Sequence, residues 1–493
     1  GRPHLLAVAA SCRLACRGRS SRRRTRASLR GVREDGEVES QRPVGPLLSW
    51  LSGLGAKGLE GLRLAPSPQA GRGVGVFATR DFQPGSTFCE VPADALLVAT
   101  PGDRAALPGE ASPEAALAAA LLRERSLGQA SRFASFIAAL PRRGELAPGH
   151  PLLWPAGLEP RDLLAGSAHG RRVAAEVLGR CRDDAAALVA SGFAGNEEDA
   201  HWALVIVDSR AFTFKPDTPA EQLALLPLLD MLNTFSLLQD GEELWQCVFD
   251  SEGTAANGAL LSVERPIRAG DEVLHLYSSN SSALQLMVYG FLEEGDGGEN
   301  PFEIAGFVAD VEAALRGDDK DLADMKLSIL SKVGFERDNL LVELPGDSEV
   351  GGPLLPVARL LCCACAEELE TVAPMLDGID TDEQAPRNLG LALEVRARTV
   401  VASWLRTALR ESDEAKASLE RSISAAAGTS SEACLRRLAA TLISRERPVL
   451  ELELHTTEHF IAGAEVALAG GPDARNEFES RHWDDETGWL GAG

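Results

Sequence analysis

Apolar and polar positions along the chain change their spacing from one region to the next. Residues 62–100 contain short apolar runs separated by glycine and proline, with Gly73 and Gly75 near the start. Punctuation of this kind is typical of a meander of short β-strands. Residues 101–205 are rich in alanine and leucine, which favours helices. This part of the chain therefore predicts small sheets joined to a helical segment.

In a second apolar region, residues 201–291, polar residues interrupt runs that are otherwise apolar. The runs ALLSV and VLHLY, on either side of an Arg-Ala-Gly-Asp turn, predict two strands, and SALQLMVYGF predicts a short helix ending in a turn at Gly290. Asp230 and Asn233 stand inside the apolar run LLDMLN. Buried polar side chains need hydrogen-bond partners, and a bound ligand is one candidate for that role.

The C-terminal part of the chain is dominated by long amphipathic patterns. Examples are VADVEAALRGDDKDLADMKLSILSKVGF and RNLGLALEVRARTVVASWLRTALRES. Apolar positions that recur at this spacing predict amphipathic helices, and hence a helical domain over residues 301–470. Residues 471–493 are acidic, contain glycine and carry aromatic side chains, and we expect a flexible tail there.

Charge is distributed unevenly along the chain. The net charge is −24, yet residues 1–33 contain ten arginines and neither Asp nor Glu, so the remainder carries −34. An acidic body disfavours nucleic acid as a partner and is compatible with a basic protein substrate. The Arg-, Ser- and Ala-rich segment within residues 1–45 is typical of an organelle transit peptide, and a disordered basic tail is the other interpretation. We expect a chloroplast location, with the mitochondrion or the cytoplasm as alternatives.

The cysteines do not form a pattern that predicts a metal site. The nine cysteines include one cluster, Cys362-Cys363-Ala364-Cys365, and neither a histidine nor a second cysteine pair stands around it at zinc-ligand spacing. A buried helix face carrying small thiols is the preferred interpretation. We expect a reduced protein without structural disulfides. No apolar run reaches the roughly 18–20 residues that a membrane span needs, so no membrane partner is expected.

One histidine motif gives an alternative. The run His455-Thr456-Thr457-Glu458-His459 matches the H-x-x-E-H pattern of a class of zinc proteases. That chemistry needs a helix, a third ligand and a zinc-activated water. The residues before the motif alternate instead of showing a clear helix, and no third ligand is evident. Two histidines on a helix surface are the preferred interpretation.

Four short motifs occur in one order in the middle of the chain. They are Ser-Arg-x-Phe at 209–212, Pro-x-x-Asp-x-x-Asn at 227–233, Gly-Asp-Glu-Val at 270–273 followed by Tyr277, and Tyr-Gly-Phe at 289–291. Each motif alone is weak, but together they make a specific pattern. In this order and spacing they resemble the SET domain of protein methyltransferases, and more narrowly the class named for the RuBisCO large-subunit lysine methyltransferase.

The resemblance implies an α+β fold. A SET domain of small β-sheets is expected over residues 46–300, with a helical insertion at about 101–205. An all-helical substrate-binding domain is expected over residues 301–470. The resemblance extends over roughly residues 60–470.

The resemblance also implies an activity, the transfer of a methyl group from S-adenosylmethionine to a lysine of a protein substrate, with no metal. Such a displacement requires nucleophile, methyl and sulfonium nearly in line, so positioning supplies much of the catalysis. The lysine must be neutral although its reference pKa is about 10.4. A narrow apolar channel beside the sulfonium favours the neutral amine through desolvation and like-charge repulsion.

Roles for individual residues follow from the resemblance. Tyr277 is expected to be the catalytic hydroxyl beside the reacting amine. Residues assigned to the methyl donor are Gly73, Gly75, Arg210, Asn233, Thr234 and Phe291. On the substrate side, Tyr289 is expected to line the lysine channel, and Asp230 to hold the adjoining loop or contact substrate.

Two positions depart from the family pattern. Thr234 stands where the family has a histidine, which is tolerable if that residue contributes through its backbone and weakens donor binding if its ring packs against the donor. Ser278 follows Tyr277 where many SET domains have glycine. The alternative function is a catalytically silent SET-like protein that serves as a binding or scaffold module. It predicts weak or absent donor binding on a correct fold.

Overall fold

The computed structural model describes residues 45–489 with internal gaps. The gaps are 69–72, 147–148, 156, 215–221, 235–245, 251–257, 276, 278–280, 293–301, 305–314, 316, 333–341, 345–353, 378–389, 426–430 and 485–487. Residues 1–44, which hold nearly all of the predicted transit peptide, and Ser278 lie outside the described residues. The chain divides into two compact units, Gly1–Arg142 with Asp184–Ser279, and Arg143–Asp183 with Asn280–Gly493. The predicted domain boundaries at 46 and 300 stay predictions.

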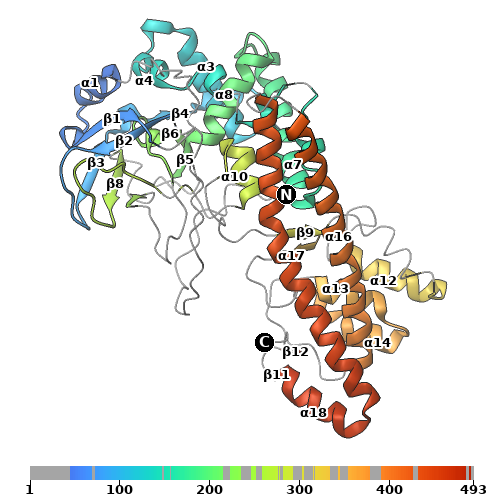
Figure 1. Cartoon of the computed structure of the whole chain (residues 1–493). Helices are drawn as coiled ribbons and strands as arrows, with labels where there is room; N and C mark the ends of the chain where they lie inside the picture. The colour runs from blue at the N-terminus through green and yellow to red at the C-terminus, as the bar shows by residue number, and fades with distance from the viewer. Residues whose placement is uncertain are drawn as a thin grey trace. The chain divides into compact units, whose positions relative to one another are not determined.

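Three small antiparallel sheets make up the β part of the first unit (Figure 1). One pairs β1 (Leu62–Pro66) with β2 (Val74–Ala78). The second has the order β3 (Thr87–Val91), β8 (Ala259–Val263), β7 (Cys247–Asp250). The third has the order β4 (Leu97–Val98), β6 (Gln222–Leu225), β5 (Ala211–Phe214). The short strands predicted for residues 62–100 are confirmed, but the meander is wrong beyond β1 and β2, because β3 and β4 pair with strands from later in the chain.

Strand β8 shows why these segments pair. Its residues alternate, so that Ala259, Leu261 and Val263 are buried while the two residues between them are partly exposed. Successive side chains of a strand point to opposite faces, so this alternation places one face of the sheet on the core. In β3 the consecutive residues Phe88 and Cys89 are both buried, at a point where the pairing register with β8 shifts.

The prediction that VLHLY, residues 273–277, forms a strand is wrong. Its residues form isolated bridges instead: Leu274 pairs with Asn233 and His275 with Cys247, both in parallel. The neighbouring Glu272 bridges Phe77. The described residues of this short segment pass from one neighbour to the next, so they form no continuous ladder with a single partner strand.

Helices cover the third sheet of the first unit. Helix α3 (Pro113–Ser126) contacts α8 (Glu197–Arg210) and strands β4 and β6. Ser112 and Asn196 cap the two helices by accepting hydrogen bonds from the backbone of their first turns. Helix α7 (Ala168–Ala190) lies between α3 and α8 in the sequence. The helical character predicted for residues 101–205 is confirmed, and their role as an insertion stays a prediction.

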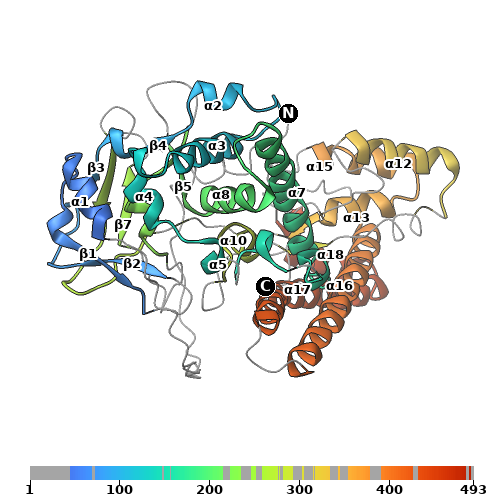
Figure 2. The same cartoon turned by 90° about the horizontal axis from the view of Figure 1, so that it is seen from above.

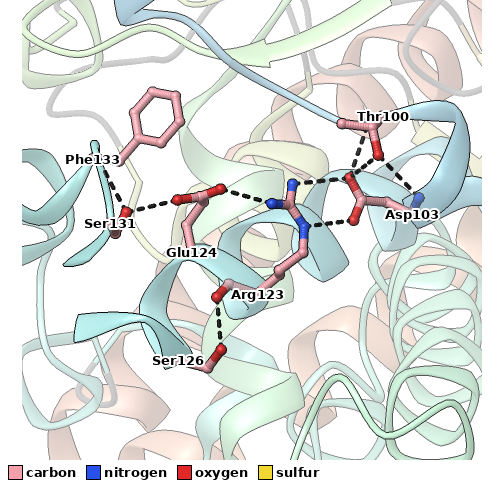
Figure 3. A network of polar contacts seen from close by, with 7 residues as sticks. All are labelled: Thr100, Asp103, Arg123, Glu124, Ser126, Ser131 and Phe133. Atoms are coloured by element: carbon pink, nitrogen blue, oxygen red, sulfur yellow. Dashed lines mark hydrogen bonds and ion pairs between the residues drawn. The ribbon is translucent and has the colours of Figure 1, made fainter. Parts of the chain in front are cut away.

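A polar network fixes the start of this insertion (Figure 3). Arg123 donates to both carboxylate oxygens of Asp103, at 2.9 and 3.2 Å, and to Glu124 at 2.7 Å. Thr100 and Asp103 form a reciprocal capping box on helix α2 (Pro101–Ala105). Burial alone would raise the pKa of Asp103, but the hydrogen bonds from Arg123 and Thr100 lower it. Glu124 also accepts from Ser131, so one network joins α2, α3 and the loop after α3.

The C-terminal part of the second unit is helical, as the amphipathic patterns predict. Helices α16 (Leu391–Ala425) and α17 (Ser431–Ala469) lie side by side (Figures 1 and 2). Helix α13 (Leu354–Cys362) packs on α16 and also contacts α12 (Lys320–Lys332) and α14 (Ala366–Val372). Two short strand pairs add to this helical region, β9 (Phe302–Ile304) with β10 (Val342–Leu344), and β11 (Trp483–Asp484) with β12 (Gly488–Trp489). None of the described helices combines the length and the apolar character that crossing a bilayer requires.

Two features of this region differ from the sequence prediction. Pro472–His482 of the predicted tail form helix α18, and Phe478 packs edge-on against Phe460 with ring centroids 5.4 Å apart. The prediction of a flexible tail is therefore wrong for this segment. The cysteine cluster does not lie on one buried helix face either, because α13 ends at Cys362 and Cys365 is exposed.

A buried charge cluster lies at the centre of the helical region. Glu394 accepts from Arg359 at 2.8 and 3.0 Å and from Arg398 at 2.7 Å, and all three residues are almost inaccessible to solvent. The Arg398 guanidinium also stacks over the ring of Phe460, 3.9 Å from its centroid. Burial alone would raise the pKa of Glu394, but the two arginines outweigh it and lower the pKa from its ordinary 4.5 to about 2.

This cluster predicts an acid-sensitive contribution to stability. Because the pKa of Glu394 is lower in the folded state than in the unfolded state, its ionised form stabilises the folded protein. This contribution is fully present above pH 4.5 and is lost as the pH falls through about 2. Glu394→Gln is expected to lower the free energy of unfolding by about 3–5 kcal/mol at pH 6, because it leaves buried arginines unpaired. Urea unfolding followed by circular dichroism between pH 2 and 6 measures both effects.

The difference between wild type and Glu394→Gln should shrink as the pH approaches 2. Glu465→Gln, at an exposed position of α17, serves as the control and should track the wild type. A difference between wild type and Glu394→Gln that stays constant with pH would contradict the prediction.

Candidate functional site

The apolar run with the two polar residues forms a tight turn in the first unit. Residues Leu229–Met231 make one turn of 3₁₀ helix, η6, directly after Leu228, whose φ is +80°. A leucine in this conformation costs about 1–3 kcal/mol and persists only where the surroundings impose it. Asp230 and Asn233 are only 5% and 7% exposed. The expectation that both polar residues are buried is confirmed.

Arg210 reaches this turn from the end of helix α8. Strands β5 and β6 pair with Ala211 opposite Leu225, which brings Arg210 close to the chain that follows β6. Its Nη1 donates to the carbonyl oxygen of Asp230 at 2.6 Å and lies 3.3 Å from Asp230 Oδ2. The two residues therefore form an ion pair whose carboxylate is fully buried. Arg210 Nε is buried and makes no hydrogen bond within the described part of the chain.

Asn233 faces a carboxylate that the sequence analysis did not single out. Its Nδ2 donates to Glu272 Oε1 at 2.7 Å, and Ser67 Oγ donates to Glu272 Oε2 at 2.9 Å. Gly75 lies against the same pair, because a Cβ added there would overlap Glu272 Oε1 and lie 3.0 Å from Asn233 Nδ2. Glu272 belongs to the Gly-Asp-Glu-Val motif, and that motif was the only sequence signal that pointed to it.

Tyr277 lies alongside the same turn. The backbone N–H of His275 donates to the carbonyl oxygen of Asn233 at 3.0 Å. Further along, Tyr277 donates its hydroxyl hydrogen to the carbonyl oxygen of Leu232 at 2.7 Å and its backbone N–H to Thr234 Oγ1 at 3.3 Å. The threonine that departs from the family pattern is only 2% exposed and contacts the backbone of the tyrosine expected to be catalytic.

His275 is a second residue that the sequence analysis missed. Its Nδ1 lies 3.1 Å from the carbonyl oxygen of Cys247, so Nδ1 must carry a hydrogen. Burial lowers the pKa of His275, which keeps the ring neutral. The ring centroid lies 5.9 Å from that of Phe212 and 6.4 Å from that of Tyr277. His275 therefore contributes a neutral aromatic face beside Tyr277.

Of the nine residues assigned from the resemblance, seven belong to the first unit. Contacts join Arg210 to Asp230, Asn233 to Gly75 through Glu272, and Thr234 to Tyr277. The seventh, Gly73, has a φ of +69° and accepts a hydrogen bond from Ser67 N at 2.7 Å, so it holds the same loop as Gly75.

Tyr289 and Phe291 belong to the second unit. Helix α10 (Ser282–Tyr289) forms as predicted, and the Tyr289 and Phe291 ring centroids lie 6.0 Å apart. Gly290 caps the helix with a φ of +76°. A Cβ on Gly149 would overlap the carbonyl oxygen of Gly290, and His150 Nε2 lies 3.2 Å from the carbonyl oxygen of Val288. The chain at the Tyr-Gly-Phe motif thus packs closely against residues 149–150.

This contact predicts the result of Gly290→Ala. A Cβ at this position would lie 2.7 Å from His150 N in a backbone conformation that L-residues avoid, so the variant should lose about 1–3 kcal/mol of stability and displace Tyr289. The chain contains two tyrosines, so labelling with 3-fluorotyrosine gives two ¹⁹F resonances, which Tyr289→Phe assigns. The Tyr289 resonance is expected to shift.

Gly179→Ala is the matched control for this experiment, because an added Cβ there meets nothing within 4 Å. It should leave the Tyr289 resonance unchanged and should not lower the unfolding midpoint, because alanine favours the interior of helix α7 over glycine. An unchanged Tyr289 resonance in Gly290→Ala would contradict the packing argument.

The H-x-x-E-H motif lies on a helix surface, which confirms the preferred interpretation. His455 and His459 are exposed on α17, whose helical conformation the alternating sequence did not predict. Glu458, which would be the base of a protease, accepts a hydrogen bond from Arg406 at 2.7 Å and forms an ion pair with it. Among the described residues, no group of three or more His, Cys, Asp or Glu side chains could hold a metal ion.

Comparisons with known proteins connect this arrangement to solved structures. No protein-family model and no curated protein sequence matches the chain. The structure titled "Crystal structure of the SET domain of LSMT bound to Lysine and AdoHcy" matches with a TM-score of 0.61 and 18% identity, over 87% of this chain and 93% of that chain. "Structure of Rubisco LSMT bound to AdoMet" matches with a TM-score of 0.59 and 17% identity, over 86% and 93%. The chain therefore has the SET fold of LSMT with its helical C-terminal region, as the motifs predicted.

Proposed function

We propose that this chain is an S-adenosylmethionine-dependent protein-lysine N-methyltransferase. One observation carries the proposal: His275 and Tyr277 lie alongside residues 232–234 in the first unit. They bring the Tyr277 hydroxyl, the Asn233 amide and the Thr234 hydroxyl to one turn. The fold supports the same function, since one solved structure of LSMT that shares it has lysine and AdoHcy bound and another has AdoMet bound.

The residues on the donor side fit a ligand that has charged and polar ends. Arg210 Nε is a buried donor without a hydrogen-bond partner in the described part of the chain, which suits a carboxylate. Gly75 lies against Asn233 and Glu272, where any side chain would obstruct a close approach. Gly73, Thr234 and Phe291 complete the proposed donor set. Bound S-adenosylmethionine supplies a methyl group activated by its sulfonium.

On the substrate side, Tyr277 is positioned to orient an amine. Its hydroxyl hydrogen is directed to the carbonyl oxygen of Leu232. The phenolic oxygen can then accept from an amine N–H, which turns the nitrogen lone pair away from the ring. Neutral His275 and the ring of Phe212 provide an apolar surface beside it, and low polarity favours the neutral, nucleophilic amine. We propose that Tyr289 lines the channel for the lysine.

The substrate is proposed to be a non-histone protein of an organelle, with the chloroplast as first choice and the mitochondrion or cytoplasm as alternatives. The ten arginines and missing acids of residues 1–33 support import. A fusion of residues 1–45 to a fluorescent protein tests the location, because import requires the segment to carry its cargo into the organelle. Cytoplasmic fluorescence would overturn the organellar location and favour the cytoplasmic alternative.

A catalytically silent scaffold is the second candidate, because Thr234 replaces the family histidine. The two functions separate in one experiment on residues 46–493. Calorimetry measures S-adenosylmethionine binding, and organelle extract supplied with methyl-labelled donor reports transfer to protein lysine. Saturable binding together with labelled lysine supports the enzyme. A folded protein that binds no donor supports the scaffold, and Thr234→His then tests whether the histidine restores binding.

A further inference from the structure

Glu272 is a carboxylate inside the proposed donor site with no cation to neutralise it in the described part of the chain. Its two oxygens accept from the Asn233 amide and the Ser67 hydroxyl, which are both neutral groups. No described Lys, Arg or His forms an ion pair with it. Arg210, a cation of the same site, pairs with Asp230. Among the described residues, the groups that compensate the negative charge of Glu272 are therefore two neutral hydrogen-bond donors.

The surrounding contacts hold this carboxylate in place. The Phe77–Glu272 bridge fixes its backbone, and Val273 N donates to the carbonyl oxygen of Val76 at 2.7 Å. Gly75 leaves room for its side chain, since a Cβ there would overlap Oε1. The fold holds this carboxylate in place, so no free energy is lost to rearranging the side chain when a ligand binds.

Glu272 also determines which way the Asn233 amide points. An ionised carboxylate only accepts hydrogen bonds, so the NH₂ group of Asn233 must face it and Oδ1 must point away. The outward group of Asn233 is then an acceptor. A negative carboxylate and an amide oxygen side by side favour a ligand that is positively charged or donates hydrogen bonds.

The methyl donor and the product it leaves differ in one charge. In the transfer the amine lone pair forms a new C–N bond, the C–S bond breaks, and sulfur keeps that electron pair. The cationic sulfonium becomes a neutral thioether, while the nitrogen gains the charge and later releases a proton. A fixed negative charge in the site therefore interacts differently with the two ligands although their remaining atoms are the same.

We propose that Glu272 makes the donor site selective for the cationic ligand, so that the donor binds preferentially and the neutral thioether is released. This inference rests on the proposed function and assigns Glu272 a role in specificity. Three ligands of similar shape differ in their charge at the sulfur position, so they separate the effect of charge from that of shape. S-adenosylmethionine has a cationic sulfonium there, sinefungin has an ammonium, and S-adenosylhomocysteine has a neutral sulfur.

Calorimetry on the full chain compares wild type with Glu272→Gln, which keeps the size of the side chain. Its single amide oxygen can accept from Asn233 Nδ2, so the Asn233 amide keeps its orientation, and its NH₂ group can donate to Ser67 Oγ. The variant is expected to bind S-adenosylmethionine and sinefungin about tenfold more weakly, equivalent to about 1.4 kcal/mol. Its affinity for S-adenosylhomocysteine should stay within about twofold of wild type. Equal losses for all three ligands, or no loss, would overturn the inference.

Two further variants exclude indirect effects. Asp271→Asn removes the same charge one residue away, at an exposed turn where Asp271 accepts from Arg268 N, and should keep the wild-type selectivity. Glu272→Asp keeps the charge and should retain selectivity even if affinity falls for all three ligands. If Glu272→Gln does not fold, loss of selectivity in Glu272→Asp counts against the proposal. A folded wild type that binds none of the probes overturns the proposed function and this inference together.

Discussion

Tyr277→Phe is expected to lower kcat for lysine methylation by about 10²–10³-fold. Removing one hydroxyl that acts on the reacting atoms typically has an effect of this size. Donor affinity should stay within about twofold of wild type, because the described contacts of the hydroxyl and backbone of Tyr277 go to Leu232 and Thr234. Single-turnover rates with labelled donor, combined with calorimetry, separate the two effects.

Tyr289→Phe is the matched control, since it removes the only other tyrosine hydroxyl of the chain. It should change KM for the protein substrate more than kcat. Activity of Tyr277→Phe within tenfold of wild type would contradict the role of Tyr277. A loss of donor binding together with activity would indicate that the ring supports the pocket instead of the reaction.

Asn233→Ala is expected to weaken S-adenosylmethionine binding by about 5- to 150-fold. The substitution removes the amide that donates to Glu272 at 2.7 Å and leaves that carboxylate with one fewer donor. Unsatisfied buried polar groups cost about 1–3 kcal/mol each, which sets the expected range. The backbone bond from His275 N to the Asn233 carbonyl does not depend on the side chain, so the turn should persist.

Calorimetry measures this loss, and circular dichroism checks that the variant is folded. Gln222→Ala removes an exposed amide on β6 of the same unit and should bind donor like the wild type. Donor affinity within threefold of wild type in Asn233→Ala would remove Asn233 from the proposed donor set. Its polar members would then be Arg210, Thr234 and Glu272.

Local sequence patterns predicted the elements that depend on near neighbours. Gly290 follows an apolar run at helical spacing, and it ends α10 in the left-handed conformation that glycine favours. The glycine-separated runs of residues 62–100 became short strands. The VLHLY strand was wrong because alternation describes how a segment could pair, whereas the identity of its partners depends on chain far away in the sequence.

The sequence by itself determined the order of the motifs, the helical character of the C-terminal region, and the candidates Tyr277, Asn233 and Asp230. Residue type and spacing carry that information. Only the tertiary structure decided what those side chains contact. Asn233 meets Glu272 from 39 residues away, and a carboxylate so placed has no local signature that separates it from a surface acid. Long-range contacts depend on how the whole chain packs, and for that reason Glu272 and His275 emerged as site residues only from the fold.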